Sequence, residues 1–118
     1  MGAGNREKMM NKVYMAFTDG TAKYPEAGTG TVPAISYVAL GLAGEAGEVA
    51  DKVKKLIRDG DTPELRAAIK KEVGDVLWYW TRMCRELGIE PEAIAQENVD
   101  KLQSRKDRGV LQGSGDNR

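Results

Sequence analysis

The sequence predicts an all-α fold in which four helices form a single bundle. Apolar residues recur at helical spacing in four segments of the chain. Prolines at helix-start positions open the later segments, and glycines punctuate the boundaries between them. A chain of 118 residues is one domain by length, and 41% hydrophobic content provides only a thin core for a lone bundle. We therefore expect the bundle to assemble as a dimer or tetramer, which buries more surface.

The first predicted helix covers residues 5–17 and is expected to end at the turn pair Asp19-Gly20. Its apolar positions at helical spacing are Met9, Met10, Val13 and Phe17. The next segment, Thr18–Val32, is rich in glycine and threonine, and a loop this long inside a compact domain is either mobile or functional. Its GTGT run is not followed by the Gly-Lys-Ser/Thr of a P-loop, which favours a flexible loop or lid over a phosphate cradle.

The second predicted helix runs from Pro33 to Arg58, because proline suits the first turn of a helix and an Asp-Gly pair follows as a stop signal. Three glycines lie inside it, and each costs about 1 kcal/mol relative to alanine. They are Gly41, Gly44 and Gly47. Gly41 lies on the same side as the acidic residues described below, so its missing side chain leaves room for a ligand or for a close neighbour.

The third predicted helix has the clearest boundaries. Thr62 is placed as its N-cap and Pro63 as its first residue, and the helix is expected to reach Leu87 before Gly88 ends it. The run Glu90-Pro91-Glu92 then opens a fourth helix.

The fourth predicted helix has a weak apolar stripe and one polar face. Asn98, Lys101 and Arg105 follow one another at helical spacing, which puts an amide and two cations on that face. The periodicity is lost after about Asp107. We therefore expect a single domain over residues 1–108 and a flexible tail over residues 109–118.

Composition excludes several classes of function. Lys+Arg and Asp+Glu both count 18, so a net charge of zero gives no reason to expect a nucleic acid polymer or a membrane as partner. The absence of histidine excludes His-ligated zinc and Ser-His or Cys-His catalysis, and the lone Cys84 is expected to be a buried filler. No apolar run is long enough for a membrane span or a signal peptide, which predicts a cytoplasmic protein.

The most informative feature is a repeated pair of acids, Glu45 with Glu48 and Glu72 with Asp75. Each pair is spaced i, i+3, so its two carboxylates project from one side of a helix. Each pair also borders the apolar ridge of its helix, so both pairs lie along one seam if both ridges enter one core. Four carboxylates in a small volume repel one another unless protons or cations intervene, and hard divalent cations such as Mg²⁺ suit oxygen ligands.

A structural explanation competes with this one. Glu48 lies four residues before Lys52, and Asp51 lies four before Lys55, both in the favourable orientation for helix ion pairs. A solvated, ion-paired face therefore explains the first acid pair. It does not explain why the second pair occupies the same angular position beside its own ridge.

The two acid segments together resemble the MazG-like members of the all-α nucleoside triphosphate pyrophosphohydrolase superfamily. The matching residues are LGLAGEAGEVADKVKK followed by KKEVGDVLWYW, with the Glu-x-x-Glu and Glu-x-x-Asp halves of the family signature. The segment ENVDKLQSRKDRG also resembles the closing Lys-x-x-x-Arg element of the family, here Lys101 and Arg105. The resemblance covers about Ser36 to Arg108, and the chain before Ser36 matches poorly.

The resemblance implies Mg²⁺-dependent cleavage of a nucleoside triphosphate between the α- and β-phosphates, which yields the monophosphate and pyrophosphate for pool sanitation or dNTP control. It implies that the metal, with Mn²⁺ as a possible substitute, is held by the catalytic carboxylates of Glu45, Glu48, Glu72 and Asp75. The leaving pyrophosphate would contact the fourth-helix residues Asn98, Lys101 and Arg105, together with Lys52 or Lys55. Without histidine, the general base is either a carboxylate or a metal-bound hydroxide.

The third predicted helix also carries two aromatic residues close to its acid pair. Tyr79 lies one turn beyond Asp75, where it either touches the sugar or base or packs at the bundle edge. Trp78 is expected to point outward into a subunit interface.

A dUTP- or dCTP-selective pyrophosphatase is the closest alternative enzyme, with phosphoribosyl-ATP hydrolysis more remote, and a non-catalytic helical interaction module is the alternative of a different class.

Overall fold

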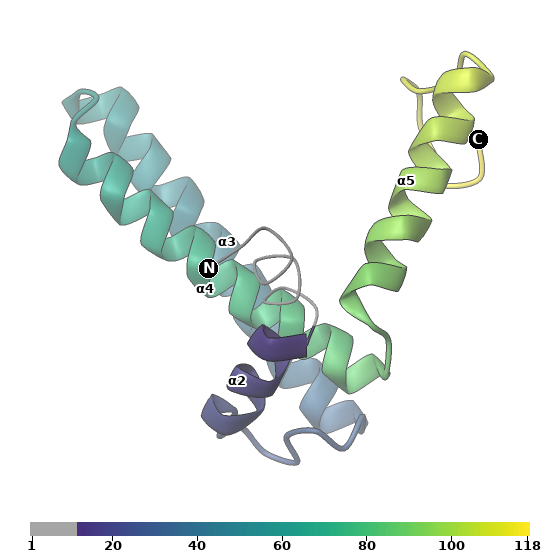
Figure 1. The fold of residues 1–118 in the computed structure, drawn as a ribbon. Coiled ribbons are helices and arrows are strands. Elements are labelled where there is room, and N and C mark those ends of the chain that lie inside the picture. Colours follow the sequence, from purple (N-terminus) through teal and green to yellow (C-terminus); the bar gives the residue numbers. More distant parts are fainter. Residues whose placement is uncertain (1–11) are drawn as a thin grey trace.

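The computed structural model describes residues 12–118, which fold into four helices (Figure 1). They are α2 (Tyr14–Thr21), α3 (Val32–Asp59), α4 (Pro63–Leu87) and α5 (Pro91–Asp107). Among the described residues there is no strand. The all-α prediction is therefore confirmed for the described residues, and the boundaries of the last three helices differ from those expected by at most one residue.

The long helices α3 and α4 lie side by side along most of their length (Figure 1). The connection between α3 and α4 is short, because local residues end α3 and start α4 within a few positions. The Gly60 backbone N–H closes α3 by donating to the Leu56 carbonyl. Thr62 then caps α4 by accepting from the Leu65 backbone N–H at 3.2 Å, and Gly88 ends α4 in the left-handed conformation at φ 68°.

The first described helix, α2, does not end at Asp19-Gly20 as expected. It continues to Thr21, because the hydroxyls of Thr18 and Thr21 bond to carbonyls of the preceding turn and Asp19 is held by arginines of α4. Residues 5–11 of the first predicted helix, with Met9 and Met10, lie outside the described residues.

The loop between α2 and α3 is shorter than predicted and is tied to α4. The backbone N–H groups of Gly28 and Gly30 donate to the two carboxylate oxygens of Glu86, at 2.8 and 2.9 Å. Gly30 has φ +70°, and a Cβ there would lie 2.8 Å from the Glu86 carbonyl oxygen, so only glycine suits this close approach. Glu86, and not a phosphate, occupies these two backbone donors.

A small apolar core lies where the loop, α3 and α4 meet. Its buried members are Tyr24, Ala34 and Val38, with Trp78 among the partly buried residues packed against them. The prediction that Trp78 points outward is therefore wrong. Its ring meets Tyr24 edge-on, and its indole N–H donates to the Thr21 hydroxyl at 2.8 Å.

The helix α5 projects away from the α3 and α4 pair and packs extensively against none of the other described helices (Figure 1). Four helices are present, but they do not close into a bundle within one chain. Residues 109–118 turn back beside α5, and large apolar side chains stay exposed on all four described helices. These include Leu40, Ile57, Val73, Val99 and Leu102. Within the described part of the chain, no helix has the length and apolarity needed to cross a membrane.

Candidate metal centre

Three of the four predicted acids converge between α3 and α4. Glu45, Glu72 and Asp75 each offer one carboxylate oxygen, and these three oxygens lie within 4.8 Å of one another. The convergence follows from the i, i+3 spacing on α4 and from the packing of the two helices, which brings Glu45 opposite that pair.

The fourth predicted acid, Glu48, lies beside this cluster and not in it. Its carboxylate is 3.5 Å from the ammonium of Lys52, which is also 3.0 Å from a carboxylate oxygen of Glu72. Lys52 therefore bridges Glu48 to the edge of the cluster. The competing ion-pair explanation is also realised at Asp51, which lies 3.3 Å from Lys55.

The proximity of the carboxylates separates their pKa values. A hydrogen bond with Glu72 raises the pKa of Glu45, and partial burial and the neighbouring negative charges raise it further. The hydrogen bond from Lys52, followed by the one from Glu45, lowers the pKa of Glu72. Opposite shifts of this kind are expected when like charges share a site without a cation.

Tyr79 packs directly across Gly41. A Cβ on Gly41 would collide with Cε1 of the Tyr79 ring, so the glycine makes room for a close neighbour, which is one of the two alternatives left by the sequence. Burial raises the pKa of Tyr79, and the nearby ionisable groups of Tyr37, Glu45 and Asp75 add to the effect. Tyr79 therefore lies at the edge of the acid cluster.

The predicted phosphate-binding residues of α5 are not brought to the acid cluster within one chain, because α5 projects away (Figure 1). Asn98 and Lys101 line a shallow surface hollow together with Ile94 and Glu97. Arg105 is buried under the tail and donates to the Asp116 carbonyl at 2.7 Å. Its Nε has no hydrogen-bond partner among the described residues.

Sequence reasoning missed several residues near this centre. Tyr14 of α2 is close enough for the charge of Asp75 to raise its pKa, after the larger effect of burial. Tyr37 precedes Gly41 by four residues and Glu45 by eight, a spacing that could have marked it as lying on the acid side of α3. Arg82 and Glu86, both buried, had no periodic signal because their distant partners lie in α2 and in the loop before α3.

The donor set suits a hard divalent cation. Three carboxylate oxygens from two rigid helices offer the ligand type that Mg²⁺ and Mn²⁺ prefer, and their spacing lets one ion contact all of them. No histidine is present in the chain, so a softer nitrogen-ligated metal is not favoured. A cation here would also relieve the repulsion that displaces the pKa of Glu45.

Comparison with known proteins agrees with this geometry. The family model described as the MazG nucleotide pyrophosphohydrolase domain matches residues 35–110, a range that includes all four predicted acids and the closing basic element. The chain is also similar to the Gene 37 protein of Mycobacterium phage L5, with 49% identity over 110 residues that cover 90% of this chain and 96% of that protein. No solved structure matches the chain.

Proposed function

This chain belongs to the family of MazG nucleotide pyrophosphohydrolase domains, and we propose that it hydrolyses nucleoside triphosphates to monophosphates and pyrophosphate with a divalent cation. The observation that carries the proposal is the convergence of Glu45, Glu72 and Asp75. Removal of noncanonical nucleotides or control of dNTP levels is the role that we propose for this activity.

Glu45, Glu72 and Asp75 would hold Mg²⁺, or Mn²⁺ in its place. When bound, such a cation neutralises phosphate charge, orients the α-phosphorus and lowers the pKa of a water. Glu48 is one turn away on α3 and paired with Lys52. We propose that it joins the ligand set when Lys52 turns toward the substrate, because a lysine held by two carboxylates is already placed beside incoming phosphates.

Lys101 and Arg105, with Asn98, are proposed to bind the leaving pyrophosphate, which requires α5 to approach an acid cluster. Within one chain α5 projects away from it, and the exposed apolar residues of α3, α4 and α5 need cover. We therefore propose a dimer or tetramer in which α5 of one copy lies over the acid cluster of another. The same association would bury the exposed side chains of Leu40 and Val99.

A panel of canonical and modified dNTPs and NTPs with Mg²⁺ tests the function. The expected products are pyrophosphate and the nucleoside monophosphate in equal amounts, and both should vanish when the metal is chelated. Release of inorganic phosphate in place of pyrophosphate would contradict cleavage between the α- and β-phosphates. Turnover confined to dUTP or dCTP would favour the selective alternative.

The non-catalytic alternative is favoured by the ion pairs of Glu48 and Asp51 with lysines. It predicts no response to Mg²⁺. The metal site instead predicts that Mg²⁺ raises the melting temperature, since a ligand that binds only the folded chain stabilises it.

A further inference from the structure

We propose that Tyr37 is the platform on which the nucleobase of the substrate stacks. The inference rests on the function proposed above and assigns the base-binding end of the same site. It is carried by the position of Tyr37 on α3, by its half-exposed ring, and by the buried network that holds the ring beneath it.

Tyr37, Gly41 and Glu45 follow one another at i, i+4 and i+8 on α3. They therefore share one side of the helix, with Tyr37 about 12 Å along the axis from the acid cluster. That span is comparable with the length of a nucleotide from its phosphates through the sugar to the base. A triphosphate held at Glu45 and lying along α3 toward its N-terminus places its base at Tyr37.

Tyr79 occupies the step between these two ends. Its ring lies across Gly41, and both Tyr37 and Glu45 are close enough to influence its ionisation. Because Gly41 has no side chain, the Tyr79 ring lies close to the backbone of α3, where it could contact the sugar. Along α3, the acids thus face the phosphates of the nucleotide, Tyr79 faces the sugar and Tyr37 faces the base.

The ring of Tyr37 is covered on one face, and the residue as a whole stays half-exposed. It stacks on Tyr24 with centroids 5.2 Å apart and an interplanar angle of 14°. Tyr24 is buried, whereas Tyr37 keeps 46% of its surface exposed. Since one face is covered by Tyr24, the other is available to stack with a planar ligand.

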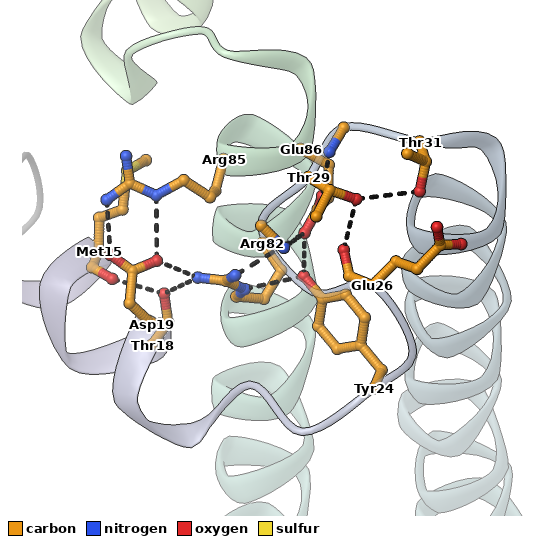
Figure 2. Close-up of polar contacts among 12 residues, drawn as sticks. Met15, Thr18, Asp19, Tyr24, Glu26, Thr29, Thr31, Arg82, Arg85 and Glu86 are labelled. Carbon is orange, nitrogen blue, oxygen red and sulfur yellow. Dashed lines mark hydrogen bonds and ion pairs between the residues drawn. The ribbon is translucent and has the colours of Figure 1, made fainter.

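The ring beneath Tyr37 is rigidly held (Figure 2). The Tyr24 hydroxyl donates to the carboxylate of Glu86 and accepts from Nε of Arg82 at 3.1 Å. Burial, followed by the hydrogen bond to Glu86, raises the pKa of Tyr24 to about 12, so the phenol stays neutral. A platform ordered before binding loses little entropy when the base arrives.

Stacking of this kind tolerates any base, because every base presents a π-face. Tyr37 is therefore expected to favour nucleotides over inorganic polyphosphate, without ranking the bases. That gives the inference a test that is independent of turnover.

Binding of a dNTP analogue with a non-hydrolysable α,β-linkage and of inorganic triphosphate, both with Mg²⁺, is measured by calorimetry. Tyr37→Ala should weaken binding of the analogue about ten-fold and leave inorganic triphosphate unchanged. Tyr37→Phe should bind like the unaltered protein, because it keeps the ring. Phe17→Ala, the truncation of an exposed aromatic side chain on α2, is the matched control and should change neither ligand.

Tyr37→Leu covers Tyr24 without offering an aromatic face, so it separates stacking from stability if Tyr37→Ala folds poorly. Full-affinity binding of the analogue by Tyr37→Leu or Tyr37→Ala overturns the inference, as does equal weakening of both ligands. An unaltered protein that binds inorganic triphosphate as tightly as the analogue also overturns it, while the phosphate and metal site stands. Binding of neither ligand would instead refute the proposed function itself.

Discussion

The carboxylates of Glu45, Glu72 and Asp75 form an electrostatically unfavourable group in the metal-free chain. Their oxygens lie within 4.8 Å of one another, with Lys52 as the adjacent cation at 3.0 Å from Glu72. Such an arrangement lowers the stability of the folded chain, and a bound cation would relieve the repulsion. We therefore expect these carboxylates to bind a cation and not to stabilise the fold.

Replacing Asp75 with Asn should abolish hydrolysis and the Mg²⁺-dependent rise in melting temperature. The melting temperature of the metal-free variant should equal or exceed that of the unaltered protein, because one repelling charge is gone. Thermal unfolding with and without Mg²⁺, combined with a pyrophosphate assay, measures both effects. Asp51→Asn is the matched control, since Asp51 is an acid of α3 paired with lysines outside the cluster. A variant that is inactive only because it unfolds would contradict the metal role of Asp75.

Glu86 has the opposite character, since its carboxylate is buried but fully partnered (Figure 2). Burial alone would raise its pKa, but hydrogen bonds from Tyr24, Gly28 and Gly30 and the charge of Arg82 outweigh burial and lower it. A lowered folded-state pKa means that the ionised form contributes stability above the ordinary pKa of a glutamate. That contribution is lost as the pH falls through the folded-state value.

Glu86→Gln should therefore destabilise the chain by about 3 kcal/mol near neutral pH, because Arg82 loses its buried counter-ion. The difference from the unaltered protein should shrink on acidification, when Glu86 itself is protonated. Urea unfolding at neutral and acidic pH measures this. Asp19 also faces Arg82, and Arg85 and Arg82 lower the pKa of Asp19. Asp19→Asn removes this second acid and should therefore narrow the pH range over which the free energy of unfolding changes. The exposed Glu97→Gln is the control, and a pH-independent deficit for Glu86→Gln would contradict the assignment.

The helix α3 carries three interior glycines that differ in their surroundings. A Cβ at Gly41 would collide with Tyr79, whereas a Cβ at Gly44 or Gly47 would meet no atom within 4 Å. Helix propensity alone favours alanine at all three positions. The packing of α3 against α4 therefore decides which of them must be glycine.

Gly41→Ala should destabilise the chain by about 1–3 kcal/mol and lower activity, because Tyr79 is displaced from the edge of the acid cluster. Gly44→Ala should instead stabilise the chain by up to about 1 kcal/mol through helix propensity. Chemical unfolding of the two variants compares their free energies of unfolding for the same glycine-to-alanine substitution. If Gly44→Ala destabilises the chain only at high protein concentration, a partner copy lies against that face of α3.

The whole chain leaves α5 apart from the helix pair that carries the acids (Figure 1). Its cation Lys101 and the cluster containing Asp75 are thus on separate parts of one molecule. The proposed phosphate contact of Lys101 therefore requires an oligomer in which α5 of one copy lies over the acid cluster of another.

Mixing two defective variants tests that arrangement. Asp75→Asn should be inactive, and Lys101→Ala should lose about ten-fold in kcat/KM for every triphosphate, since a phosphate contact carries no information about the base. If α5 acts between copies, a mixed oligomer contains one site with both defects and one with none. Its activity should therefore exceed the mean of the two variants. Activity equal to the mean, or a monomer mass in light scattering at micromolar concentration, would contradict the model.

Helix positions and the acid pairs followed from the sequence, because they depend on residues within one or two turns. Thr62 and Gly88 cap α4 as local chemistry predicts, and the spacing of Glu72 and Asp75 places both on one side of α4. Cys84 is buried as expected.

The tertiary structure alone decided how these elements meet. Trp78 turned inward because the loop before α3 supplies Tyr24 as its neighbour, and Glu86 gained backbone partners 58 and 56 residues away. The space beside Gly41 is occupied by the ring of Tyr79. Helical periodicity states which side chains share a face, but it contains no information on the rotation of one helix against another or on the path of a loop. The rotation of a helix and the path of a loop depend on contacts between residues distant in sequence. These contacts leave Glu48 outside the group of three carboxylates that converge.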